Sequence, residues 1–270
     1  MEVIDYKGYR FLKVCESPNI VISLNSTEQF CNLSEEGKQD LLNQAFGVSA
    51  FNEFIQVHGT SIFNLDLNTS EYDGYIERKQ NVANAIRTAD CIPLILWNEK
   101  NKLIIGLHCG WRGIASGIIE KALQNDELDI THAYIGPHIS KDHFEVKRDF
   151  IESFQEYGLN IDRYITVRDD KMYMDLRSLC EAKLHEKHVK IINKESHPME
   201  ADRKMVVYKI FLPLLNAVES SFKELDVILS LCESSGKEAL KDRDHNKNRQ
   251  RKKKPDAPKG LLSLLQYTDI

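Results

Sequence analysis

The chain has 270 residues, of which 42% are hydrophobic and 29% are charged, a composition typical of a globular protein with one large core or two smaller ones. Its formal net charge of −5 argues against a protein that coats nucleic acid or anionic lipid. The first residues lack a basic stretch followed by an apolar run, and the longest apolar segments, 103–111 and 205–218, are too short to span a bilayer. We therefore expect a cytoplasmic protein, monomeric or homodimeric, that binds neither membranes nor nucleic acid.

The first part of the chain predicts short strands followed by a helix. Residues 1–33 are typical of short strands and loops, and the β-branched segment NIVISL predicts one of these strands. Ser34 precedes EEGKQDLLNQAF, whose acidic first turn and leucines on one face predict a helix with Ser34 as its N-cap. Residues 53–59 and 61–67 then have the character of two strands separated by Gly59.

The middle of the chain alternates between apolar strands and helical patterns. IPLILW and KLIIGLHC predict buried strands, WRGIASGIIEKAL a loop running into a helix, and HAYIGPHIS a strand that ends at Gly136. DFIESFQEYG predicts a helix that ends at Gly158, MYMDLRSLCEAKLHEKH a second long helix, and VKII a short strand. Because strands and helices mix without a regular βαβ rhythm, we expect an α+β fold of layered mixed β-sheets with flanking helices.

The character of the sequence changes after about residue 196. Residues 197–235 have a helical pattern that contains Pro213, which should kink or restart the helix. Residues 236–270 are charged and predict a disordered tail, with residues 261–270 as a possible short amphipathic helix. The basic run KNRQRKKK is better explained as solvated tail than as a nucleic-acid contact, because no aromatic residues interleave with its charges. The main folded domain is therefore predicted to span residues 1–196.

Three residues with metal-binding side chains, His58, Cys91 and His108, lie at predicted strand ends beside a glycine, a proline or a turn. Two imidazoles and a thiolate suit zinc and leave a fourth position for water, whose pKa zinc lowers toward ~7. The alternative is that the histidines are hydrogen-bonded core residues and the cysteine is a small hydrophobe, since the long gaps between them match no zinc-finger spacing. The six cysteines form no CxxC pair, so we expect reduced thiols.

A second segment, HCGWRGIASG, places two glycines around Trp111 and Arg112 at the entrance of a predicted helix. Glycines allow the backbone to approach an anion, the helix N-terminus favours negative charge, and Arg112 can add a bidentate phosphate contact. The alternative is a structural salt bridge of Arg112, with glycines that serve close packing. A third segment, IGPHISKDHFEV, places His138 and His143 near a turn, and a surface or supporting role is favoured for His143.

The motifs QVHGT, TADCIPLIL, GLHCGWRGIASGIIEKAL, YIGPHISKDHFEV and MYMDLRSL occur in the order and approximate spacing of the laccase-domain family, also called multicopper polyphenol oxidoreductase or purine nucleoside phosphorylase. The chain resembles this family over roughly residues 53–184. The resemblance implies the α+β fold and a metal site at His58, Cys91 and His108. It also implies phosphorolysis of adenosine, inosine, guanosine and methylthioadenosine, and deamination of adenosine, with phosphate as co-substrate. Arg112 and the glycine turn around it are our candidates for binding this anion.

Alternative functions stay open alongside this interpretation. The resemblance also implies hydrolytic editing of a peptidoglycan precursor, and its older label implies copper and phenol oxidation, which rank below zinc chemistry. The family's closing arginine-rich segments are not recognisable after about Ser196, where KESHPMEADRKMVVYKIFLPLL stands instead. A catalytically impaired member that acts by binding is therefore a further alternative.

Overall fold

The computed structural model describes residues 2–15, 17–25, 29–30, 32–98, 100–124, 126–193 and 198–199. These all belong to the first of two units into which the chain divides, Met1–Ala217 and Val218–Ile270. The helical segment and the charged tail predicted at residues 197–235 and 236–270 lie outside the described residues, apart from Pro198–Met199. The domain boundary predicted at residue 196 therefore stays a prediction. No helix in the described part of the chain is long and apolar enough to cross a membrane.

A small antiparallel sheet opens the chain, with strands β1 (Glu2–Tyr6), β2 (Tyr9–Cys15) and β3 (Ile20–Ser23). Helix α2 (Glu35–Phe46) follows, and the Ser34 side chain accepts a hydrogen bond from the Gly37 N–H, which confirms the predicted N-cap. Buried side chains of this sheet and helix form a core of their own. Next to them, β4 (Ala50–Asn52) pairs in parallel with β7 (Val82–Asn84).

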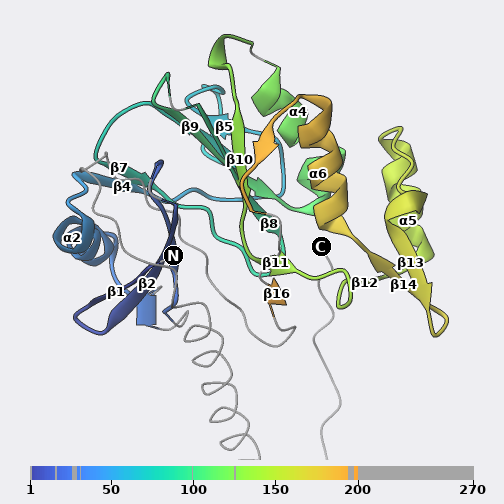
Figure 1. Ribbon diagram of the computed structural model, residues 1–270, viewed down its shortest axis with the longest axis horizontal. Helices are drawn as coiled ribbons and strands as arrows, with labels where there is room; N and C mark the ends of the chain where they lie inside the picture. Colours follow the sequence, from blue (N-terminus) through green and yellow to red (C-terminus); the bar gives the residue numbers. More distant parts are fainter. Residues whose placement is uncertain are drawn as a thin grey trace, which may run out of the picture. The chain divides into compact units, whose positions relative to one another are not determined.

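A six-stranded mixed sheet forms the centre of the described unit (Figure 1). Its strand order is β15 (Lys190–Ile191), β10 (His132–Ile135), β8 (Ile92–Asn98), β9 (Leu103–Cys109), β6 (Gly74–Glu77) and β5 (Ile62–Phe63). The two outer pairings are parallel and the three inner ones antiparallel. Every residue of β8 and β9 is buried, as expected for strands covered on both faces.

Short helices cover the central sheet. Helices α4 (Ile118–Leu123) and α6 (Leu176–Glu186) pack against β9 and β15 and against each other (Figure 1). The remaining elements are listed here with their bounds: α3 (Trp111–Ala115), η1 (Asp126–Leu128), β11 (His138–Ile139), β12 (Glu145–Val146), α5 (Arg148–Glu156), η2 (Asp162–Tyr164), β13 (Ile165–Arg168), β14 (Lys171–Met174) and β16 (Pro198–Met199). Strands β12, β14 and β13 form a third sheet, and β11 pairs with β16. The expected α+β architecture of mixed sheets and flanking helices is confirmed.

Four of the predicted elements have different limits in the structure. The predicted strand over residues 53–59 is reduced to an isolated bridge between Ile55 and Glu71, and the strand predicted over residues 61–67 is only the two residues of β5. The long helix predicted from Met172 begins at Leu176 instead, because the first residues form β14 and pair with β13. The segment predicted as a loop and one helix forms two short helices, since Gly117 between them has φ of +89°.

Candidate metal centre

His58, Cys91 and His108 meet at one end of the central sheet. Strands β8 and β9 pair so that Pro93 lies opposite His108, and Cys91 immediately precedes β8. His58 arrives from the loop before β5. One ligand atom from each of the three side chains lies within 4.8 Å of the other two, close enough for all three to bind one ion. His108 is buried, Cys91 is half-buried and His58 is exposed, so the cluster reaches from the core to the surface.

The sequence-based reason for expecting this cluster was only partly right. Cys91 does stand at a strand end, but His108 lies within β9, one residue before its last, and His58 follows no strand. What brings His58 to the sheet is instead a buried carboxylate, Asp73, which sequence reasoning missed. The only sequence signal for this role is that Asp73 directly precedes the apolar segment GYIE, which is buried. A carboxylate in such a place needs hydrogen-bond donors around it.

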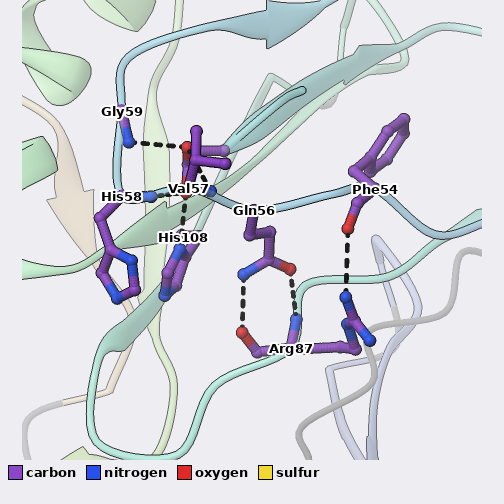
Figure 2. Close-up of polar contacts among 8 residues, drawn as sticks. Phe54, Gln56, Val57, His58, Gly59, Arg87 and His108 are labelled. Atoms are coloured by element: carbon purple, nitrogen blue, oxygen red, sulfur yellow. Dashed lines mark hydrogen bonds and ion pairs between the residues drawn. The ribbon is translucent and has the colours of Figure 1, made fainter. Parts of the chain in front are cut away.

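Asp73 is fully buried and ties both histidines together. Its Oδ2 accepts hydrogen bonds from the N–H groups of Val57 (3.1 Å) and Gly59 (2.7 Å). Its Oδ1 accepts from the N–H of His58 (2.9 Å) and lies 2.8 Å from Nδ1 of His108 (Figure 2). Burial alone would raise the pKa of Asp73, but the hydrogen bonds from His108, Gly59 and Val57 outweigh it and lower the pKa. Asp73 is therefore an ionised carboxylate at neutral pH.

This carboxylate determines which nitrogen of His108 is available to a metal. An ionised carboxylate can only accept hydrogen bonds, so Nδ1 of His108 must carry the proton that it donates to Asp73. In the neutral imidazole, the lone pair available to a metal is then the one on the other nitrogen, Nε2. A carboxylate behind a ligand histidine is the arrangement that orients the imidazole in many metal sites and increases its basicity.

The backbone and charge environment of His58 also suit metal binding. Its φ of +61° lies in the left-handed region, which is uncommon outside glycine, and the three N–H bonds to Asp73 hold the loop in this conformation. Burial lowers the pKa of His58, and the neighbouring His108 and Arg112 lower it further, against the opposing effect of Asp73. The imidazole is therefore neutral at neutral pH, as a metal ligand must be.

The thiol of Cys91 is protonated until a cation binds. Burial, with the negative charges of Asp90 and Asp73, raises the pKa of Cys91 to about 11. A divalent cation at this thiol favours the thiolate, so binding would release a proton to solvent. Asp90 itself is exposed, and its backbone carbonyl accepts the N–H of Ile139, which ties this loop to β11.

Gly110 leaves the space in which the cluster forms. A Cβ at this position would lie 2.6 Å from Cδ2 of His58 and 3.1 Å from Sγ of Cys91. A Cβ at Gly113 would lie 3.0 Å from the carbonyl oxygen of Gly59, in the loop of His58. Both glycines therefore allow close packing around the cluster. This is the second of the two roles considered for them from the sequence, the first being approach of the backbone to an anion. Helix α3 has only five residues, so its N-terminus adds little attraction for anions.

Arg112 lies on the face of Trp111, with its Cζ 4.6 Å from the ring centroid. Trp111 is held in turn against Phe150 and Phe154, at centroid distances of 5.0 and 5.5 Å. Within the described residues Arg112 forms no ion pair, so the salt bridge considered as its alternative role is not found there. Its guanidinium is exposed, and its charge acts on His58.

The other histidines singled out in the sequence do not join the cluster. His138 is buried, and its Nδ1 lies 2.7 Å from the carbonyl oxygen of Gly136. His143 lies on the surface with its Nδ1 2.7 Å from Oγ of Ser140, which agrees with the supporting role favoured for it. Only His58, Cys91 and His108 form a group of metal-binding side chains in the part of the chain that the structure describes.

Comparison with known proteins identifies a matching family and several related proteins. Residues 33–203 match the family described as multi-copper polyphenol oxidoreductase laccase. A purine nucleoside phosphorylase of Rickettsia conorii is 32% identical over 146 residues, which cover 51% of this chain and 60% of the relative. Adenosine deaminase RL5, from an unknown prokaryotic organism, is 32% identical over 120 residues, which cover 42% and 45%. The chain thus matches about 60% or less of the length of these curated relatives.

Solved structures show the same fold at lower sequence identity. A Neisseria meningitidis protein superposes with a TM-score of 0.60 at 20% identity, covering 78% of this chain and 98% of that one. The hypothetical protein YfiH of Bacillus licheniformis gives 0.59 at 16% identity, covering 77% and 100%. At these identities the likeness concerns the fold alone.

Proposed function

The chain belongs to the multi-copper polyphenol oxidoreductase laccase family, and from this premise we propose that it is a zinc-dependent enzyme that phosphorolyses purine nucleosides and deaminates adenosine. The observation that carries the proposal is the convergence of His58, Cys91 and His108 within 4.8 Å. Relatives of the chain named purine nucleoside phosphorylase and adenosine deaminase support the choice of substrate.

The residues present fit a zinc ion. His58 is neutral, His108 is held by Asp73 through Nδ1 so that Nε2 is the nitrogen left for a metal, and Cys91 offers a thiol that becomes a strong ligand on deprotonation. Three protein ligands are the usual set of a catalytic zinc, which keeps one position for water or substrate. Two histidines and a cysteine also match copper sites, which the family description names, but the relatives reported above are named for phosphorolysis and deamination, so zinc is our first choice.

In this proposal the chain's own residues bind and orient the substrates. A zinc ion held by His58, Cys91 and His108 would supply Lewis acidity to the reaction. Arg112 binds phosphate, because its side chain is exposed, lies on the ring of Trp111 and is close enough to His58 to lower that residue's pKa. Phosphate on Arg112 would then be oriented toward the sugar carbon from which the base departs.

The first experiment measures metal content and adenosine turnover on one preparation, with and without phosphate. We expect about one zinc per chain and phosphate-dependent release of adenine, both lost in a His58→Ala, Cys91→Ala double variant. Zinc without turnover of any purine nucleoside would overturn the substrate assignment and leave the peptidoglycan-precursor or binding-only alternatives. Copper with oxidation of phenols would replace the proposal by the activity in the family's description.

A matched pair of arginine variants tests the phosphate site. Arg168 also lies on an aromatic ring, 4.4 Å from the centroid of Tyr173, but it belongs to the surface hairpin of β13 and β14. We expect Arg112→Ala to raise the KM for phosphate about 10- to 100-fold, as for the loss of a charged hydrogen-bond donor. Arg168→Ala should leave it unchanged. An equal KM in both variants would remove Arg112 from the phosphate site.

A further inference from the structure

The loops that carry His58 and Cys91 begin together and then separate. Strands β4 and β7 pair up to Asn52 and Asn84, and the N–H of Ala85 donates to the carbonyl oxygen of Asn52 at 2.9 Å. Beyond this point the described residues form no backbone hydrogen bond between residues 53–58 and residues 86–91. The distance between the two ligands is therefore not fixed by the strand pairing itself.

The side-chain amide of Gln56 replaces the missing backbone pairing. Its Nε2 donates to the carbonyl oxygen of Arg87 at 2.7 Å, and its Oε1 accepts the N–H of Arg87 at 2.8 Å (Figure 2). These two reciprocal bonds define the orientation of the amide, because the N–H requires the oxygen and the carbonyl requires the nitrogen. The guanidinium of Arg87 makes a longer contact, 3.4 Å, with the carbonyl oxygen of Phe54.

We infer that Gln56 is a positioning residue of the metal centre, which sets the spacing between His58 and Cys91 and so increases metal affinity. Gln56 stands two residues before His58, and its partner Arg87 stands four residues before Cys91. Asp73 fixes His58 relative to His108 but makes no contact with the loop of Cys91 among its hydrogen bonds. The amide of Gln56 supplies that third connection. This inference rests on the proposed function only in taking the three side chains as metal ligands.

The chain provides a closely matched control for this bond pattern. The side-chain amide of Asn25 pairs with Arg10 in the same reciprocal way, at 2.8 and 3.0 Å, in the N-terminal sheet. Asn25→Ala removes two bonds of the same kind, and a further one from the Asn25 amide to Oγ of Ser23, without touching either ligand loop. Gln56→Met keeps the length of the side chain and loses the amide, and Gln56→Glu keeps only the acceptor for the Arg87 N–H. Arg87→Ala keeps both backbone partners of Gln56.

The test is the affinity of each variant for Zn²⁺, measured by competition with a chelator, and the thiolate absorption of its Co²⁺ form. We expect Gln56→Met to lower the Zn²⁺ affinity about tenfold or more and to alter the Co²⁺ spectrum, with Gln56→Glu between it and the parent. Asn25→Ala should lower the melting temperature but keep the parent affinity, and Arg87→Ala should stay within about threefold.

The outcomes separate this inference from the proposed function. If Gln56→Met and Gln56→Glu bind Zn²⁺ with the same affinity as the parent, the positioning role is wrong and the metal site stands. If Asn25→Ala loses as much affinity as Gln56→Met, the effect reflects general stability and the positioning role is again wrong. A parent chain that binds neither Zn²⁺ nor Co²⁺ would overturn both proposals together.

Discussion

Asp73 is the residue whose substitution should affect the metal centre most without removing a ligand. Asparagine at this position would keep one acceptor oxygen. Its NH₂ group would replace the other oxygen and, being a donor, could not accept the backbone N–H groups that now donate there. We expect Asp73→Asn to lower Zn²⁺ affinity 10- to 100-fold, as in other sites whose supporting carboxylate is lost. The buried donors left without partners should also cost about 1–3 kcal/mol of unfolding free energy.

Zn²⁺ titration and urea unfolding of the chelated protein measure these two effects separately. Asp66→Asn is a suitable control, because Asp66 also accepts a backbone N–H, that of Ile62, but contacts no ligand loop. Full Zn²⁺ affinity in Asp73→Asn would show that the carboxylate supports folding only.

Gly110 gives a second residue-scale prediction. Alanine there would place its Cβ 2.6 Å from Cδ2 of His58, so the imidazole must move away from Cys91 and His108. Zn²⁺ affinity should fall by about tenfold or more in Gly110→Ala. Gly59→Ala is the matched control, because a Cβ there meets only ordinary contacts, at 3.5 Å and beyond, and its N–H bond to Asp73 remains. Equal loss of affinity in the two variants would contradict the steric argument.

Residue chemistry explains how much of this centre could be predicted from the sequence. His58, Cys91 and His108 are recognisable because few side chains bind transition metals and each stands in an apolar context. Asp73 and Gln56 were not found, because aspartate and glutamine are ordinary surface residues in a sequence. Their roles depend on which backbone N–H groups lie near them in three dimensions. The need for a glycine at position 110 likewise comes from the imidazole of His58, which is 52 positions away in the sequence.

At the scale of elements, a side-chain N-cap is the local sequence signal that marks where a helix begins. Ser34 was recognised and α2 begins after it as predicted. Asp175 is the corresponding cap of α6, but it lies inside the apolar pattern of MYMDLRSL, which predicts one helix over both β14 and α6. Over so short a segment, the residues MYM fit the period of a helix as well as that of a strand. Only their pairing with β13 decides for the strand. The loop of His58 was interpreted as a strand because its hydrogen bonds to Asp73 have no local sequence signal.

The cap of α6 leads to an element-scale prediction. Asp175 accepts the Ser178 N–H at 2.9 Å through Oδ1, and the Ser178 hydroxyl at 2.9 Å through Oδ2. Asp175→Ala should lower the unfolding free energy by about 1 kcal/mol, within the 0.5–2 kcal/mol typical of lost N-caps. Asp175→Asn, which caps helices about equally well, should lose much less. Urea unfolding of both variants checks this, and equal losses would show that the charge or the packing of Asp175 matters more than its cap.

At the scale of the whole molecule, two carboxylates with lowered pKa values among the described residues, Asp66 and Asp73, make the stability of the metal-free protein depend on pH. Asp66 is the more accessible of the two. Burial opposes its ionisation, but hydrogen bonds from Lys121 and the Ile62 N–H outweigh this and lower its pKa. A group whose pKa is lower in the folded state adds stability above its unfolded pKa, near 3.9 for aspartate. That stability is lost as the pH falls through this value toward the lowered one.

The pKa of Asp73 is also lowered in the folded state, so protonation of either carboxylate in acid should reduce the unfolding free energy of the chelated protein. We expect Asp66→Asn to be less stable than the parent at pH 7, by about 1 kcal/mol or less for a partly exposed ion pair. This difference should shrink between about pH 5 and pH 3, because the parent's own carboxylate becomes protonated there. Urea unfolding at several pH values measures it. In a Lys121→Met background the effect of Asp66→Asn should be smaller at pH 7, since the ion pair is already absent. A stability difference that stays constant from pH 7 to pH 3 would mean that Asp66 acts through its hydrogen bond to Ile62 and not through its charge.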